Sequence, residues 1–121
     1  MSDDVSPPRL TARLRVQAIL RQAALNGSTA MQVRRGDPDA GTILIKLNYL
    51  DGRFALYTPF YQSGLEPVWR CASGAEPTAE TDIDALVERH IRRDSDLWVI
   101  EIENRHGTMP VQTISPRESR P

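Results

Sequence analysis

The residues best placed to do chemistry in this 121-residue chain form one polar segment, residues 34–41 (RRGDPDAG). Asp37 and Asp39 match the spacing of the first ligands of a calcium loop, in which hard oxygen ligands alternate along the chain. Gly41, however, stands at the third ligand position, and Asn48 stands where such a loop needs a bidentate glutamate. The pattern therefore does not predict a metal site, and we expect no cofactor.

The same segment has two further interpretations. Its paired arginines, beside glycine amides, could hold a phosphate or carboxylate, because guanidinium groups bind such anions through two parallel hydrogen bonds. Aspartate, proline and glycine at these positions also suit a structural turn, and a hairpin loop between two strands is the interpretation we favour. The candidate binding residues are Arg34, Arg35, Asp37 and Asp39 in the segment, with Arg13 and Arg15 in the preceding helix.

Other reactive residue types give no catalytic pattern. Cys71 is the only cysteine, so the chain cannot form an internal disulfide. His90 falls on the apolar stripe of a predicted helix, where a core histidine is expected, and His106 follows the last predicted strand. No serine lies in a nucleophile-elbow motif, and no zinc-protease or phosphate-loop motif is present. We name no catalytic residue and expect a non-catalytic protein, although a small enzyme using Asp37 and Asp39 remains an alternative.

Charge is distributed unevenly along the chain. Between Val5 and Gly36 there are six arginines and no acidic residue, although the net charge is −1 and the sequence pI is near 6.1. The basic segment could bind nucleic acid or another anion, or it could pack against the acidic second helix of the same chain. Double-stranded RNA-binding domains, whose order α-β-β-β-α is superficially similar, need basic residues where this helix begins with Glu80, Asp82 and Asp84. The sequence therefore does not favour nucleic acid.

Length and composition fit one ordinary globular domain. Apolar residues make up 40% of the chain and charged residues 26%, and no stretch is apolar enough to cross a bilayer. The start of the chain is acidic where a signal peptide would be basic and then apolar, so we expect a cytoplasmic protein. We divide the chain into a flexible N-terminus (1–8), one α+β domain (9–105) and a flexible C-terminal tail (106–121).

Hydrophobic periodicity predicts two helices and about five strands in an antiparallel sheet, in the order α-β-β-β-β-α-β. The helices are expected at 10–25, ending at Asn26-Gly27, and from a cap at Thr78 or Thr81 to Arg93. The strands are expected at 30–35, 42–50, 53–58, 67–71 and 97–103.

The Asp51-Gly52 pair predicts a two-residue type I′ turn, which would place Leu47 opposite Leu56. All the apolar residues of that hairpin, including Ile45 and Phe54, would then share one face, on which both helices pack.

The first predicted helix has apolar residues on two sides. Val16, Ile19, Leu20 and Ala23 line one side, and Leu14, Ala18 and Leu25 line the other. A protein partner or a second copy of the chain could cover the second side. A binding or adaptor protein is therefore our leading interpretation, with anion or nucleic-acid binding through the arginine-rich helix and residues 34–41 as an alternative.

The sequence resembles a small bacterial family known as a domain of unknown function, DUF1491. The resemblance rests on residues 34–41 with the Ile-Leu-Ile-Lys strand that follows, and on residues 96–103 (DLWVIEIE). The arginine-rich helix and the Asp-Gly turn fit as well, and the match spans most of 9–105. The resemblance implies no activity, cofactor or partner, and it gives no role to Cys71 or His90.

Overall fold

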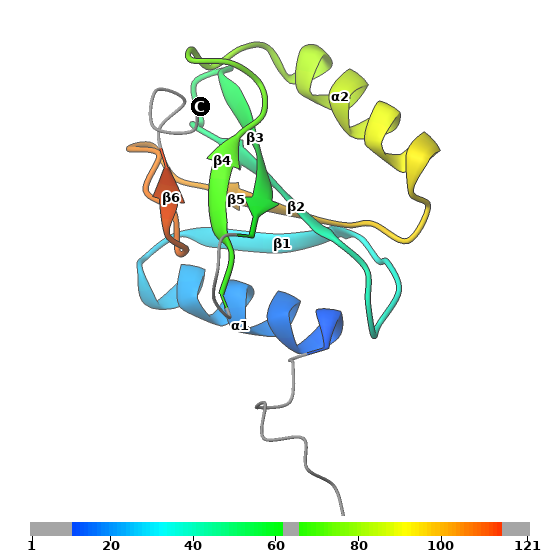
Figure 1. Ribbon diagram of the computed structural model, residues 1–121. Helices are drawn as coiled ribbons and strands as arrows, with labels where there is room; N and C mark the ends of the chain where they lie inside the picture. The colour runs from blue at the N-terminus through cyan, green and yellow to red at the C-terminus, as the bar shows by residue number, and fades with distance from the viewer. Residues whose placement is uncertain (1–10, 62–65, 115–121) are drawn as a thin grey trace, which may run out of the picture.

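The structure, a computed structural model, describes residues 11–61 and 66–114. The elements follow in the order α1 (Ala12–Leu25), β1 (Thr29–Arg34), β2 (Ile43–Asn48), β3 (Phe54–Phe60), β4 (Val68–Cys71), α2 (Glu80–Arg93), β5 (Trp98–Glu103) and β6 (Thr113–Ile114). The predicted α+β class and both helices are confirmed. The first seven elements also follow the predicted order (Figure 1).

The strands form one six-stranded mixed sheet in the order β1-β5-β2-β3-β4-β6. β5 pairs parallel with β2, and β6 pairs parallel with β4, while the remaining neighbours are antiparallel. The predicted antiparallel sheet is therefore wrong in this respect. The last long strand enters between β1 and β2, which separates the two strands that were expected to form a hairpin.

The two helices lie on opposite faces of the sheet, so the molecule has three layers (Figure 1). Ile45 and Leu47 point to the α1 face with Val16 and Ile19, whereas Leu56 points to the α2 face with Ile83. The expectation that both helices share one apolar face is wrong. Central strands buried on both faces carry apolar residues at nearly every position, so their pattern does not identify a single core side.

The β2–β3 register differs from the predicted one by one residue. Leu47 lies opposite Ala55, not Leu56, and the backbone N–H of Tyr49 donates to the carbonyl of Arg53 at 3.0 Å. Positive φ angles occur at Leu50 (64°) and Gly52 (89°) rather than at the predicted Asp51-Gly52 pair. A longer turn replaces the type I′ turn, and the shift of one residue moves alternate side chains to the other face.

Both ends of α1 are marked by capping interactions. The Thr11 hydroxyl accepts from the Leu14 N–H at 3.3 Å, which caps the first turn. At the other end Gly27 has φ of 79°, and the N–H of Ser28 donates to the Ala23 carbonyl at 2.9 Å in a Schellman motif. The predicted stop at Asn26-Gly27 is therefore confirmed.

The N-cap of α2 differs from the prediction. Ala79 occupies the cap position without a side-chain bond, whereas Thr78 and Thr81 were the predicted caps. The hydroxyl of Thr78 instead donates to the carboxylate of Asp82. The first helical turn nevertheless carries acidic residues, as the helix dipole favours.

A buried lysine ties α2 to the sheet. Lys46 of β2 is only 6% exposed, and its Nζ lies 2.7 Å from Glu80, 2.8 Å from Asp84 and 3.8 Å from Glu101. Burial alone lowers the pKa of Lys46, but the hydrogen bonds to Asp84 and Glu80 and the nearby carboxylate charges outweigh it, so the pKa is raised. The lysine therefore stays charged between the helix and the sheet.

The packed part of the chain extends beyond Arg105. Met109 and Val111 pack against the α1-side core, and β6 pairs with β4. Residues 106–114 of the predicted C-terminal tail thus belong to the folded unit. The predicted flexible segments 1–8 and 115–121 lie outside the described residues. Across the part of the chain that the structure describes, no helix has the length and apolar character needed to cross a membrane.

Replacing Lys46 by methionine should destabilise the protein by about 1–3 kcal/mol, because Glu101 would keep a largely buried charge without its cation. The double variant Lys46→Met/Glu101→Gln should recover part of this loss. Urea unfolding measures both free energies. Arg53→Met, which breaks the exposed pair with Asp51, is the control and should cost less than about 1 kcal/mol. A Lys46→Met variant as stable as the wild type would contradict this role.

Candidate functional site

Residues 35–42 cross the end of β5 on their way from β1 to β2, so they form no hairpin. The backbone N–H of Asp37 donates to the carbonyl of Asp96 at 3.0 Å. In return, the indole Nε1 of Trp98 donates to the Asp37 carbonyl at 2.7 Å. The predicted hairpin loop is therefore a crossing segment that is bonded to the strand it passes.

Two glycines allow this segment to approach β5 closely. A Cβ at Gly36 would lie 2.6 Å from Trp98 Cδ1, and a Cβ at Gly41 would lie 2.8 Å from the same atom. Both would also collide with the Asp96 carbonyl oxygen. These glycines are required by the close packing, whereas neither has a positive φ.

The Asp37 carboxylate and several backbone groups of the segment are engaged in local bonds. The Asp37 carboxylate accepts from the backbone N–H groups of Asp39 and Ala40 at 3.1 and 2.8 Å. The carbonyls of Pro38 and Asp39 accept from the backbone N–H groups of Arg13 and Ala12 at 3.0 and 3.1 Å. The segment thus caps the N-terminus of α1, where a helix has free donors.

The structure does not bring the six predicted binding residues into one site. Arg34 donates to the Leu97 carbonyl at 2.6 Å, a contact within the fold. Arg13 and Arg35 are exposed on the surface. Arg15 alone lines a ligand-sized cavity. A binding role for the other five stays a prediction.

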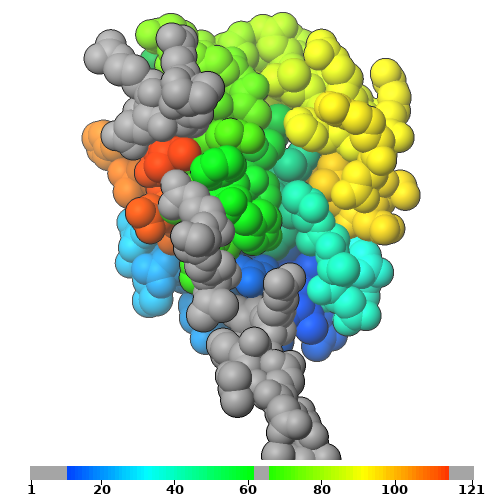
Figure 2. Space-filling view, in the orientation of Figure 1, coloured from blue at the N-terminus to red at the C-terminus, as the bar shows by residue number. Residues whose placement is uncertain are grey.

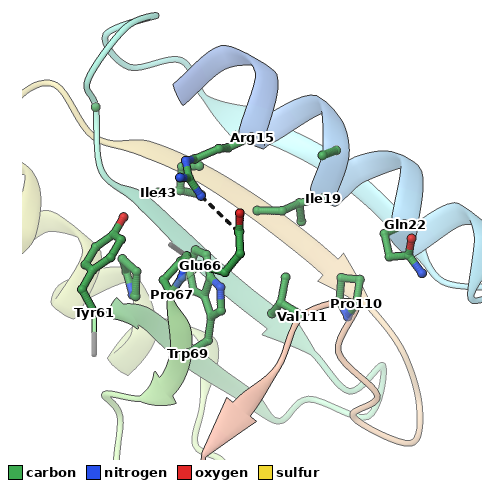
Figure 3. Close-up of a pocket in the computed structure, with 13 residues that line it drawn as sticks. Arg15, Ile19, Gln22, Ile43, Tyr61, Glu66, Pro67, Trp69, Pro110 and Val111 are labelled. Carbon is green, nitrogen blue, oxygen red and sulfur yellow. Dashed lines mark hydrogen bonds and ion pairs between the residues drawn. The ribbon is translucent and has the colours of Figure 1, made fainter. Parts of the chain in front are cut away.

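That cavity is a groove of about 330 Å³ between α1 and the sheet (Figure 3). Residues from α1 form one wall, while β2, β3, β4 and the connections before β2, before β4 and before β6 contribute the remainder. Most of the lining is apolar, and its apolar members are Ala18, Ile19, Gly41, Ile43, Pro59, Pro67, Trp69, Pro110 and Val111. The polar lining residues are Arg15, Gln22, Tyr61 and Glu66. We call this cavity the α1 groove.

One ion pair spans the α1 groove. Arg15 reaches from α1 toward Glu66, and Nη1 lies 3.4 Å from Oε2 (Figure 3). The side chain of Arg15 is 20% exposed and that of Glu66 is 74% exposed. A charged group is therefore held inside an otherwise apolar cavity by a partner that is mostly in water.

A second, more open cavity of about 380 Å³ lies on the α2 side of the sheet. His90, Arg93 and Asp94 from the end of α2 line it, together with Tyr61, which also lines the α1 groove. Figure 2 shows the teal start of β2 between the green of β3 and the yellow of α2, where this cavity lies. Burial and, secondarily, the charge of Arg93 lower the pKa of His90. The histidine is half-buried at this cavity rather than in the core.

Sequence reasoning found Arg15 but not the α1 groove around it. Trp69, Pro67 and Val111 carry no motif, and they come together only because β4 and the segment before β6 lie beside α1 in space. The only sequence signal for this site was the position of Arg15, which follows the helical spacing of the buried residues of α1. Among the described residues, no group of three or more His, Cys, Asp or Glu side chains is arranged to hold a metal ion.

The fold and the site define a three-layer α/β/α protein with a ligand-sized groove under its first helix. The sequence profile of a family described as a protein of unknown function (DUF1491) matches residues 10–112. The chain belongs to the DUF1491 family, as its residues 34–41 and 96–103 indicated.

Solved structures agree with this assignment. A crystal structure of a DUF1491 family protein from Caulobacter crescentus CB15 has 33% identity and a TM-score of 0.73, covering 89% of this chain and 100% of that one. An NMR structure of a family member from the same organism has 32% identity and a TM-score of 0.75, with coverages of 90% and 100%. Protein Atu0922 from A. tumefaciens has 30% identity and a TM-score of 0.78, with coverages of 89% and 97%. A search of curated proteins found no significant match.

Alanine at Gly36 or Gly41 should destabilise the protein by about 1–3 kcal/mol, because the added methyl group forces residues 35–42 away from Trp98. The loss of the free energy of unfolding can be measured by urea denaturation followed through tryptophan fluorescence. Asp39→Ala is the control in the same segment, since this side chain is exposed, and it should cost less than about 0.5 kcal/mol. Equal stability of all three variants would show that the segment does not pack tightly on β5.

His90 should make the protein less stable in mild acid. Its pKa is lowered from 6.5 in the folded state, so below that pH the unfolded state binds the proton more readily and unfolding is favoured. The melting temperature should fall between about pH 7.5 and pH 5.5, and the fall should be smaller in His90→Gln. His106→Gln, at an exposed position, is the control and should leave the pH profile unchanged. An identical profile in His90→Gln and wild type would contradict this assignment.

Proposed function

We propose that this protein is a non-catalytic binding protein that takes a small, mainly apolar molecule into the α1 groove. The observation that carries the proposal is a cavity of about 330 Å³ with nine apolar and four polar lining residues. Small-molecule sites in proteins are typically concave, mostly apolar and about 300–1,000 Å³ in volume, with a few polar groups that fix orientation. The α1 groove has each of these properties.

The walls of the α1 groove are well fixed for this role. Ile19, Ile43 and Trp69 belong to the buried core between α1 and the sheet, so they are held by their own packing. Val111 packs against the same core. Because these four residues need no rearrangement, filling the groove costs little ordering entropy along this part of its wall.

The alternative functions have less support from the geometry. An anion or nucleic-acid site at residues 34–41, or an enzyme using Asp37 and Asp39, would need the Arg34 and Asp37 side chains, which already bond within the fold, and would be left with the exposed side chains of Arg35 and Asp39. A partner on the outer side of α1 would contact Leu14 and Leu25, which are 44% and 74% exposed. Scattered exposed apolar side chains are normal on protein surfaces. The cytoplasmic location expected from the sequence is part of the proposal.

The neutral dye N-phenylnaphthylamine tests the proposal, because its fluorescence rises when it enters an apolar site. Titration of the folded protein should give saturable binding with one site per chain. Bound dye should also raise the melting temperature, since a ligand that binds only the folded state stabilises it. Unsaturable binding, or no enhancement at all, would overturn the proposal.

Filling the α1 groove should weaken dye binding. Ala18 lines the groove on α1, so Ala18→Phe should occupy the site and weaken dye binding by about tenfold or more. Ala24→Phe makes the same change at another exposed position of α1 that does not line the groove, and it should bind the dye as the wild type does. Equal affinity in the two variants would place the dye elsewhere. Circular dichroism should show that both variants fold.

A further inference from the structure

We propose that the ligand of the α1 groove carries a carboxylate, which pairs with Arg15 and displaces Glu66. The inference rests on the proposed function and names the chemical class of its ligand, a small monocarboxylic acid with an apolar body. In the structure the Glu66 carboxylate stands in for the carboxylate of the ligand. The argument uses the geometry of one ion pair, the charges that line the groove and the donors available there.

The Arg15–Glu66 pair is weak by its geometry. One distance, 3.4 Å between Nη1 and Oε2, joins the two side chains. Arginine and carboxylate in a strong pair form two parallel bonds of about 2.7–2.9 Å. The Glu66 side chain is 74% exposed, so it can return to water at little cost. A ligand that offers both carboxylate oxygens to the guanidinium would form the better pair.

The charges of the lining favour a monoanion. Arg15 and Glu66 are the only charged residues among the described residues that line the groove, and Gln22 and Tyr61 are its other polar members. When Glu66 swings outward, one positive charge remains in a largely apolar cavity. A guanidinium with 20% exposure is poorly hydrated there and gains from an anionic partner.

The site has too few donors for a phosphate. The nearest helix terminus is that of α1, and its first N–H groups already donate to the carbonyls of Pro38 and Asp39. A dianionic phosphate is typically held by several donors, such as a helix N-terminus, glycine amides or a cluster of basic residues. The Arg15 guanidinium, with only the Gln22 amide and the Tyr61 hydroxyl as further side-chain donors among the described lining residues, suits a carboxylate attached to an aliphatic or aromatic body.

Competition against bound N-phenylnaphthylamine tests this inference with octanoate and octanamide, which differ only in the head group. Wild-type protein should bind octanoate about tenfold more tightly than octanamide, as expected for a charge-assisted hydrogen bond in a sheltered site. High salt should weaken octanoate binding and leave octanamide binding unchanged. These measurements need no variant, so a failure of folding cannot obscure the result.

Three variants then test whether Arg15 and Glu66 cause the preference for octanoate over octanamide. Arg15→Gln should reduce the octanoate preference to about twofold or less while octanamide binds as before. Arg13→Gln removes a positive charge from the same helix outside the groove and should keep the full preference. Glu66→Gln should tighten octanoate binding about threefold, because the ligand no longer competes with an internal carboxylate.

The outcomes separate this inference from the proposed function. If the dye and octanamide bind but octanoate binds no better, the groove is a binding site and the carboxylate inference is wrong. The same conclusion follows if the octanoate preference persists in Arg15→Gln, or if Glu66→Gln leaves octanoate affinity unchanged. If neither the dye nor either octyl compound binds, the proposed function itself fails, and this inference fails with it.

Discussion

The arrangement of the molecule depends on the contact between Trp98 and the segment that crosses the end of β5. The indole N–H of Trp98 bonds to the Asp37 carbonyl, and two glycines allow the backbone to lie against the ring. This contact fixes β5 between β1 and β2. It also holds residues 35–42 in place, and their carbonyls in turn cap α1. One tryptophan therefore links the topology of the sheet to the position of the helix above the groove.

The α1 groove follows from this arrangement. α1 begins beside residues 38 and 39, then crosses the face of the sheet with Ala12, Val16, Ile19 and Ala23 buried beneath it. Strands β4 and β6 lie farther along the sheet, so the space at the flank of α1 is lined but not filled. Arg15 stands at the boundary between the buried stripe of the helix and this space. Its long aliphatic stem can lie along apolar walls while its charged end meets Glu66.

The sequence predicted the local elements well because their signals are local. Both helices end within a few residues of their expected bounds, and the strand around Trp98 and Ile100 lies within the expected range 97–103. Strand pairing was predicted poorly, since the entry of β5 between β1 and β2 depends on contacts far apart in the chain. The hairpin register failed for a related reason. β2 is buried on both faces, so a shift by one residue still places apolar side chains opposite one another.

The candidate site was predicted even less completely. Residues 34–41 drew attention because their residue types are chemically active, yet Arg34 and Asp37 bond within the fold and Arg35 and Asp39 are exposed. Arg15 was recognised by charge alone, and neither its partner Glu66 nor the lining residue Trp69 has a signature along the chain. A site whose walls come from α1, three strands and three connecting segments is defined by packing. No spacing rule of a single sequence reports such a surface.

The strand order also makes β1 and β6 the two edge strands of the sheet. β6 has only two residues, and the pairing of β1 with β5 is interrupted by a bulge between Gln32 and Arg34. A bulge twists an edge strand away from the geometry that another molecule would need to extend the sheet, and a very short strand offers few free backbone groups. In the described part of the chain, both edge strands are thus poor templates for pairing with a strand of another molecule. The irregularity in β1 disfavours the addition of a further strand at that end of the sheet edge.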